Sequence, residues 1–355
     1  MIDSPPSLPS TRSPSARHAP RSPAGCDRLS ALSGLVGDTP LLAIQAKLDR
    51  RRFTIYAKAE FYNLTGSIKD RMALGVIAAA YGRGALVAGQ EIVEATSGNA
   101  GIALAAVGRA LGHPVTIFMP DWMSAERRAL LRSHGAEIRL VSAEEGGFLG
   151  SIARAEQHAA QVGGFLSQQF ANPDNWRAHY AGTAPELLAQ MEAVGATPDA
   201  FVAGVGTGGT VMGVARHFRD VGLAASVHPV EPAESPTLST GHKVGRHRIQ
   251  GVSDEFIPEI VKLDELSAVI GVCDGDAILM AQRLAVELGL GVGISSGANM
   301  VAALKIAMTL PGTPAVATVF ADNSARYLST DLAREERVRD CYVAPRVELV
   351  DLRVI

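Results

Sequence analysis

The sequence contains few cysteines, little net charge and no long apolar run, and each shortage excludes a class of protein. Its 3 cysteines among 355 residues are too few and too scattered for a disulfide framework or a zinc-binding spacing. A formal net charge of −3 gives no indication of a nucleic acid or an anionic membrane as partner. An apolar stretch at 73–86 is broken by tyrosine, glycine and arginine and is unsuited to cross a bilayer. We therefore expect a cytoplasmic protein without a bound metal.

Apolar residues, by contrast, make up 47% of the chain, which is ample for a buried core. A length of 355 residues suggests two domains. Residues 1–28 differ from the rest because they are rich in proline, serine and arginine and have no hydrophobic period. Such a segment cannot bury enough surface to order itself, so we expect a disordered tail at 1–30. A transit peptide, or a ligand site on His18 and Cys26, is an alternative with a weaker pattern.

From Leu41 onward, short β-branched runs alternate with segments of helical spacing. This alternation predicts parallel sheets covered by helices on both faces. We expect the segments 39–42, 172–175 and 236–245 to be turns or loops. The expected strands are 53–60, 91–95, 114–120, 137–142, 200–206, 225–232 and 314–322, and the expected helices are 70–81, 100–111, 124–134, 211–218, 276–288 and 298–309.

Lys69 is a candidate for covalent chemistry. The chain has only six lysines, and this one follows Thr65, Gly66 and Ser67, a sequence typical of a helix start. The helix dipole opposes a cation in the first helical turn and therefore favours the neutral amine. A neutral amine is the form that makes a Schiff base. The alternative is a surface lysine that extends away from the helix end.

Two polar, glycine-containing segments each follow a predicted strand and open a predicted helix. The N–H groups of Thr-Ser-Gly-Asn (96–99) and the dipole of the following helix favour a small anion such as a carboxylate. In Gly-Thr-Gly-Gly-Thr (206–210), glycines allow close backbone approach and threonines add hydroxyl donors for a phosphate. The second segment lacks the lysine of a P-loop and the spacing of the dinucleotide fingerprint, so a single phosphate group fits better than a nucleotide. Either segment alone is also compatible with an ordinary capped helix.

Together and in this order, these segments resemble the cysteine synthase and cystathionine β-synthase family, the fold-type-II pyridoxal phosphate enzymes. The resemblance covers the chain from about residue 37 to about residue 331. It is carried by the motifs GDTPLL (37–42), GSIKDR (66–71), ATSGNAGIALA (95–105), QQFANPDN (168–175), GVGTGGT (204–210), VEPAESPTLS (230–239), IQGVSDEFIP (249–258), GISSGAN (293–299) and ARYLST (325–330).

The resemblance implies an α/β fold of two open twisted-sheet domains flanked by helices, as in the tryptophan synthase β-subunit. A large cofactor-binding domain would combine 32–73 with 179–335. A small, mobile substrate domain would span 74–178, and a C-terminal tail would span 336–355. Members of this family are usually homodimers, so we expect a homodimer.

The resemblance also implies a role for each motif residue. Lys69 would hold pyridoxal 5'-phosphate as a Schiff base and would move the α-proton of the substrate. Asn99 would bind the 3' oxygen of the cofactor. The cofactor's phosphate would be bound by Gly206, Thr207, Gly208, Gly209 and Thr210. The substrate carboxylate would be bound by Thr96, Ser97, Gly98, Asn99 and Gln169.

These roles imply β-replacement on O-acetylserine or serine. The β-substituent would leave to give an aminoacrylate, and sulfide or a thiol would add to give cysteine or a cysteine-like amino acid. Alternatives of the same class are a cystathionine β-synthase-like condensation with a thiol, a cysteine desulfhydrase that releases sulfide, and a diaminopropionate-type synthesis with an amine. A non-catalytic paralogue is disfavoured because the three motifs are intact.

Two departures from the family pattern concern the cofactor and the substrate loop. Ala100 replaces the threonine that typically follows the asparagine of TSGN, which removes one hydroxyl. Alignment on RYLST places Asn323 where a serine usually faces the pyridine nitrogen, so we expect Asn323 to make this contact, with Ser324 next. Asp322 is the alternative, and it would make the ring a stronger electron sink.

A third departure concerns the nucleophile. Asp254 and Glu255 stand where sulfide-using synthases usually carry small or apolar residues, and cystathionine β-synthases resemble this segment more closely. We hypothesise that Glu255, or Asp254, contacts the nucleophile or its amino group and helps to deprotonate a thiol. The alternative is a solvated loop.

Overall fold

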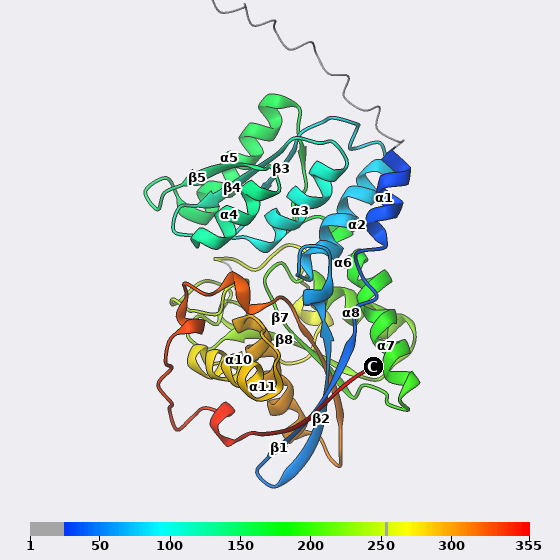
Figure 1. Ribbon diagram of the computed structural model, residues 1–355, viewed down its shortest axis with the longest axis vertical. Coiled ribbons are helices and arrows are strands. Elements are labelled where there is room, and N and C mark those ends of the chain that lie inside the picture. The colour runs from blue at the N-terminus through cyan, green and yellow to red at the C-terminus, as the bar shows by residue number, and fades with distance from the viewer. Residues whose placement is uncertain (1–24, 253–254) are drawn as a thin grey trace, which may run out of the picture.

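The computed structural model describes residues 25–252 and 255–355, and its strands form two separate sheets (Figure 1). The 7-stranded sheet has the order β11–β1–β2–β10–β7–β8–β9, and the 4-stranded sheet has the order β5–β4–β3–β6. The strands are β1 (Leu41–Leu48), β2 (Arg51–Ala59), β3 (Ile92–Ala95), β4 (Val115–Pro120), β5 (Glu137–Val141), β6 (Phe165–Leu166), β7 (Ala200–Gly204), β8 (Ser226–Pro232), β9 (Ile270–Val272), β10 (Ala315–Phe320) and β11 (Glu348–Val354).

The helices cover both sheets and connect their parallel strands. They are α1 (Gly25–Ser33), α2 (Lys69–Gly82), α3 (Asn99–Ala110), α4 (Ala125–Ser133), α5 (Gly147–Val162), α6 (Pro173–Ala178), α7 (Ala184–Ala193), α8 (Gly209–Asp220), α9 (Thr237–Thr240), α10 (Asp274–Leu288) and α11 (Ile294–Thr309). Within the described residues, no helix is both long enough and apolar enough to cross a membrane.

The large sheet is parallel from β2 to β9, and β1 runs antiparallel to both of its neighbours. Side chains along a strand alternate between the two faces, so a sheet covered on both faces needs apolar residues at every position. In β7, Ala200 and Val202 pack with α10 and α11, whereas Phe201 and Ala203 pack with α7 and α8. This explains why the strand is a continuous apolar run.

The small sheet is entirely parallel and follows the same rule. In β4, Ile117 and Met119 face α2, α3 and α4, whereas Phe118 faces α5. Figure 1 shows this sheet and its helices above the large sheet, with α2 and α6 at one side. The four strands fall inside the predicted small domain 74–178, whose boundaries remain a prediction.

Every strand and helix expected from the sequence is present, with ends shifted by a few residues. Three expected turns are partly regular: β1 begins within 39–42, α6 begins within 172–175, and α9 lies within 236–245. The predicted tail 1–30 is ordered at its end, because α1 begins at Gly25 and its Leu29 packs on the core of the small sheet. Residues 1–24, including His18, and the side chain of Cys26 lie outside the described part of the chain.

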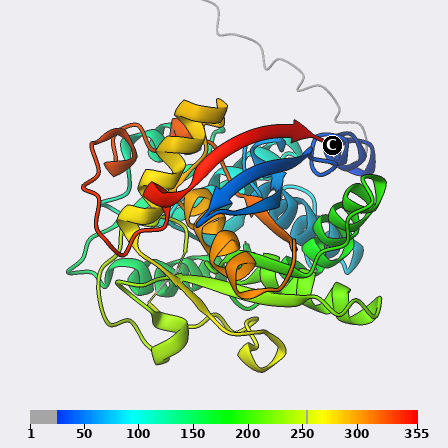
Figure 2. The same ribbon diagram turned by 90° about the horizontal axis from the view of Figure 1, so that it is seen from below.

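The C-terminal segment forms an edge strand that the sequence did not indicate. β11 pairs antiparallel with β1 and lies beside it in Figure 2. Most of its side chains are exposed, so it lacks the apolar run by which the central strands were recognised. Its Leu349 and Leu352 are partly buried against the core of the large sheet.

Helix α8 packs unusually closely on the π-helical turn η2 (His179–Thr183) that follows α6. A Cβ atom on Gly213 would lie 2.5 Å from the carbonyl oxygen of Trp176 and 2.6 Å from the Cβ of His179. Real Cβ atoms do not approach other atoms so closely, and neither obstacle is the end of a flexible side chain. The contact between α8 and η2 therefore requires glycine at this position.

We expect Gly213→Ala to destabilise the protein by about 1–3 kcal/mol, because overpacking forces the two elements apart. The measurement is the free energy of unfolding from denaturant titration. Gly82→Ala is the matched control, because the exposed Gly82 ends α2 and has no atom within 4 Å of its would-be Cβ. A Gly213→Ala protein as stable as the control would contradict the prediction.

Candidate active site

A cavity lies between the two sheets, where strands β3, β7 and β10 end. The carboxyl ends of parallel strands are where open α/β sheets bind ligands, because loops and helix N-termini converge there. The first residue of α2, Lys69, also lines it. The cavity brings together most of the predicted site residues: Lys69, Thr96, Ser97, Asn99, Gln169, Gly206, Thr207, Gly208, Gly209 and Thr210.

Lys69 is placed by the turn that precedes α2. The Asp70 carboxylate accepts hydrogen bonds from the backbone N–H of Thr65 at 2.8 Å and from its hydroxyl at 2.7 Å, which folds the turn back on the helix. The Nζ atom of Lys69 lies 3.5 Å from the Oγ1 atom of Thr207. The amine therefore reaches the predicted phosphate-binding segment, which is distant in the sequence.

That segment forms the N-terminus of α8. Gly208 precedes the helix with φ +83° and has no side chain to cap the first turn, and the N–H of Gly209 donates to the Thr207 hydroxyl at 3.5 Å. A Cβ on Gly209 would lie 2.0 Å from the Oδ1 atom of Asn175, so glycine is required here too. The side-chain amide of Asn175 donates to the Thr207 hydroxyl at 2.9 Å and to the Gln169 carbonyl at 2.7 Å. The N–H groups in the first turn of a 12-residue helix, flanked by threonine hydroxyls, suit a phosphate group.

His179 lies behind the phosphate-binding segment. Its ring nitrogens lie 2.9 Å from the hydroxyl of Thr183 and 3.4 Å from the hydroxyl of Thr210. Burial, followed by the charges of Lys69 and Arg71, lowers the pKa of His179 well below its ordinary value. The imidazole is therefore neutral, and it positions the Thr210 hydroxyl without adding a charge behind the phosphate-binding segment.

The segment 96–99 connects β3 to α3 and is braced by a buried acid. The amide of Gln169 donates to the Ala95 carbonyl at 2.8 Å, and its backbone N–H donates to Glu94 at 3.1 Å. The other donors to Glu94 are the Ser167 hydroxyl and the Ala95 N–H. Burial raises the pKa of Glu94 to about 7. Glu94 is therefore a positioning residue that was not predicted, although an acid inside the apolar strand 91–95 is a signal for it.

Asn99 is held by two residues of the segment that follows β10. Its amide nitrogen donates to Asp322 at 2.6 Å, and its amide oxygen accepts from Arg326 at 2.5 Å. Asp322 also accepts from the Tyr327 hydroxyl at 2.5 Å, and its Oδ1 atom is buried without a hydrogen-bond partner among the described residues. Of the three residues 322–324, Asp322 is thus the one whose side chain contacts Asn99.

Asn323 and Ser324, the predicted cofactor contacts, form hydrogen bonds with backbone groups of the protein. The Asn323 amide oxygen accepts from the Ala325 N–H at 3.1 Å, and the Ser324 N–H donates to the Gly291 carbonyl at 2.9 Å. Neither residue lines the cavity, whereas Ser295 and Ala321 do. A role for Asn323 or Ser324 at the pyridine nitrogen stays a prediction.

A second cavity adjoins the first. Arg127 and Phe148 line both cavities, and Glu255 lines only the second. Glu255 accepts a hydrogen bond from the Nζ atom of Lys243 at 2.8 Å. Asp254 lies outside the described residues. Sequence analysis missed Arg127, because nothing in the local pattern of α4 distinguishes it from the arginine that follows.

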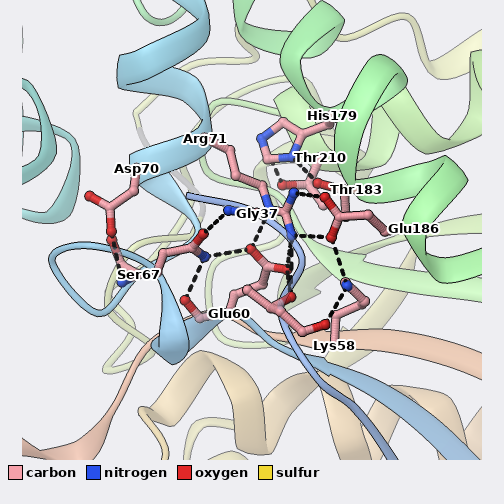
Figure 3. Close-up of polar contacts among 12 residues, drawn as sticks. Gly37, Lys58, Glu60, Ser67, Asp70, Arg71, His179, Thr183, Glu186 and Thr210 are labelled. Carbon is pink, nitrogen blue, oxygen red and sulfur yellow. Dashed lines mark hydrogen bonds and ion pairs between the residues drawn. The ribbon is translucent and has the colours of Figure 1, made fainter. Parts of the chain in front are cut away.

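A buried ion cluster holds α2 in place (Figure 3). Arg71, two residues after Lys69, forms ion pairs with Glu60 at 2.6 Å and with Glu186 at 2.7 Å. The Nζ atom of Lys58 lies 2.8 Å from Glu186 and is fully buried. Burial alone would raise the pKa of Glu186, but Arg71 and Lys58 outweigh burial and lower it to about 2. The cluster joins the end of β2, the start of α2 and the start of α7.

Comparison with known proteins identifies the family. The family model described as pyridoxal-phosphate dependent enzyme matches residues 32–322. The chain belongs to this family. A probable cysteine synthase of Bacillus subtilis (strain 168) is 42% identical over 299 residues, which cover 84% of this chain and 96% of the relative.

Solved structures agree with this assignment. A hydrogen sulfide-producing enzyme from Fusobacterium nucleatum superposes with a TM-score of 0.89 at 49% identity, covering 93% of this chain and 100% of that chain. An O-acetylserine dependent cystathionine β-synthase from Helicobacter pylori superposes with a TM-score of 0.76 at 34% identity, covering 84% and 97%. This chain is therefore a cysteine synthase-like, pyridoxal phosphate-dependent enzyme of fold type II.

The ion cluster gives a testable prediction for the stability of this enzyme. Glu186→Gln leaves Lys58 and Arg71 with Glu60 as their single carboxylate, so we expect a loss of about 3 kcal/mol at neutral pH. Because the pKa of Glu186 is lowered from 4.5 to about 2, its stabilisation is complete above pH 4.5 and is lost as the pH falls toward 2. The stability difference between wild type and variant should therefore shrink from pH 7 to pH 3.

The measurement is urea denaturation at both pH values. Glu287→Gln is the matched control, since Glu287 is exposed and pairs with Arg283 four residues earlier on α10. Exposed pairs of this kind contribute about 0.3–0.5 kcal/mol. Equal losses in the free energy of unfolding for the two variants would show that the buried cluster stabilises the protein no more than an exposed ion pair does.

Proposed function

We propose that the chain catalyses β-replacement on O-acetylserine with a sulfur nucleophile, giving cysteine or a cysteine-like amino acid. The observation that carries this proposal is the convergence of Lys69 with the N-termini of α3 and α8 in one cavity. An amine, a carboxylate-binding turn and a phosphate-binding turn are the three parts that an amino-acid substrate and pyridoxal phosphate require together. The relatives named as cysteine synthases support the same reaction.

The residues of the cavity fit the cofactor. The backbone N–H groups at 208–210 and the hydroxyls of Thr207 and Thr210 would hold its phosphate. Lys69 would hold its aldehyde carbon, and Asn99 would hold the ring oxygen. Pyridoxal phosphate, when bound, supplies an electron sink for the α-carbon of the substrate.

The protein side chains then have three tasks. Thr96, Ser97 and Gln169 would bind the substrate carboxylate at the N-terminus of α3, where the helix dipole favours negative charge. The Nζ atom of Lys69 would take the α-proton and return it after the nucleophile has added. Closure of the small domain 74–178 would exclude water and so favour replacement over hydrolysis.

A second candidate function is release of sulfide from cysteine. The 49% identity to a hydrogen sulfide-producing enzyme favours it. In this reaction, water would complete the turnover in place of the nucleophile. We further propose a homodimer, as is usual in the family.

The first test is to mix the purified enzyme with O-acetylserine and follow its visible absorption. We expect a lasting spectral change that added sulfide reverses, with cysteine as the product. Lys69→Ala should bind the cofactor non-covalently and lose activity by at least about 10³-fold, because it removes both the covalent attachment and the proton carrier. Lys262→Ala is the matched control, because Lys262 is exposed and lines neither cavity.

Two results would count against β-replacement. If O-acetylserine produces no spectral change while cysteine is converted to sulfide, pyruvate and ammonia, the second candidate function holds instead. If Lys69→Ala keeps the wild-type rate, Lys69 has no part in the chemistry.

A further inference from the structure

Two cysteines meet where the C-terminal segment packs on α10. Cys273 lies directly before the first residue of α10, and Cys341 lies in a turn shortly before the short helix η6 (Ala344–Arg346). Cys341 is exposed, whereas Cys273 is half-buried. The two thiols interact with each other, both through charge and through a hydrogen bond. The fold thus brings together two oxidisable groups that are far apart in the sequence.

The residues that follow the two cysteines are in direct contact as well. The Asp276 carboxylate accepts hydrogen bonds from the backbone N–H of Val343 at 2.8 Å and from that of Ala344 at 2.7 Å. The Tyr342 side chain packs on Gly275 so closely that its hydroxyl would overlap a Cβ atom there. A disulfide requires two Cβ atoms about 3.5–4.5 Å apart. Backbone contacts on the C-terminal side of both cysteines favour such an approach.

The two thiols differ in a way that suits the two steps of an oxidation. Thiol–disulfide exchange passes through a mixed disulfide, which a second thiol then resolves. Cys341 is exposed and accessible to a small reagent. Burial, followed by the negative charge of Glu234, raises the pKa of Cys273, which keeps this thiol protonated and slow to react with solvent reagents. Cys341 is therefore placed to react first, and Cys273 is placed to resolve the mixed disulfide.

The same junction holds the start of a segment that lines the active site. The backbone N–H of Arg248 donates to Asp274 at 2.7 Å, and its guanidinium forms an ion pair with Glu336 at 2.8 Å. Arg248 thus binds both the first residue of α10 and the C-terminal segment. Residues 250–252 follow Arg248 closely and line both cavities. A covalent bond between α10 and the C-terminal segment would therefore restrain the base of 250–252.

We propose that Cys273 and Cys341 form a reversible disulfide that fixes the C-terminal segment on α10 and restrains the segment 250–252. This inference is independent of the proposed β-replacement. The oxidant is a low-molecular-weight disulfide. The Cys341 thiolate attacks one of its sulfurs and releases the first small thiolate. The Cys273 thiolate then attacks the Cys341 sulfur and releases the second. The two protons of the protein thiols pass to the two small thiolates, so that one disulfide replaces another.

The test treats the reduced holoenzyme with oxidised glutathione and compares wild type with Cys341→Ser and Cys273→Ser. The measured quantities are the mass of the intact chain, the linked peptides after digestion without reductant, the melting temperature, and the amide hydrogen exchange of 250–252. Cys26→Ser is the matched control, because it removes a thiol of the same chain and leaves the proposed pair intact.

We expect wild type and Cys26→Ser to lose two hydrogen atoms in mass, with a link between the peptides that contain Cys273 and Cys341. The melting temperature should rise by about 2–8 °C, because the cross-link restricts the unfolded chain. Hydrogen exchange at 250–252 should slow by about 3-fold or more, since local opening there becomes rarer. Dithiothreitol should reverse these changes. Neither Cys341→Ser nor Cys273→Ser should show them.

Four results would overturn the inference. An unchanged mass, or a mixed disulfide with glutathione as the only product, would mean that the two sulfurs cannot bond in the folded chain. A disulfide that involves Cys26 or joins two chains would assign the oxidation to another pair. An unchanged or lower melting temperature would mean that native contacts break when the bond forms. Unchanged hydrogen exchange at 250–252 would overturn the link to the active site.

Discussion

The pairing of Arg71 with Glu60 and Glu186 is the interaction on which the geometry of the active site depends. It joins the end of β2, the start of α2 and the start of α7, where the side chains of Arg71 and Glu60 are buried. Two cations and two carboxylates balance one another there, so the loss of any one leaves an uncompensated buried charge. Because Lys69 is only two residues before Arg71, the same pairing fixes the backbone position from which the Lys69 side chain extends to Thr207.

The active site itself departs from the rules that stabilise the rest of the molecule. Within residues 25–252 and 255–355, helix α8 follows a glycine that has no side chain to cap it, Arg127 is buried without a carboxylate partner, and one oxygen of Asp322 has no hydrogen-bond partner. Each departure leaves a donor, an acceptor or a charge available to a small molecule. Local conflicts of this kind concentrate at functional sites, and the stability they forgo is supplied elsewhere, here by the close-packed sheets and the ion cluster.

Much of this arrangement could be predicted from the sequence because its signals lie within short, continuous segments of the chain. The central strands are continuous apolar runs, and the segments 96–99 and 206–210 each contain the whole turn that is predicted to bind an anion. What escaped prediction depends on residues far apart in the chain. Glu186 meets Arg71 across 115 positions, and β11 owes its place to the free edge of β1 rather than to its own composition. In the sequence, Arg127 cannot be distinguished from a surface arginine of an amphipathic helix, because only the tertiary structure buries it.

The division of the site into two cavities separates what the family shares from what distinguishes its members. Relatives with different named activities share this fold, so the fold and the cofactor residues cannot by themselves select the nucleophile. Selection requires groups other than those that hold the cofactor, and Lys243 and Glu255 are candidates because they line only the second cavity. Arg127 adds a charge at the junction of the two cavities. Changes at these three residues could alter the acceptor of the reaction while Lys69 and its ion cluster stay unchanged.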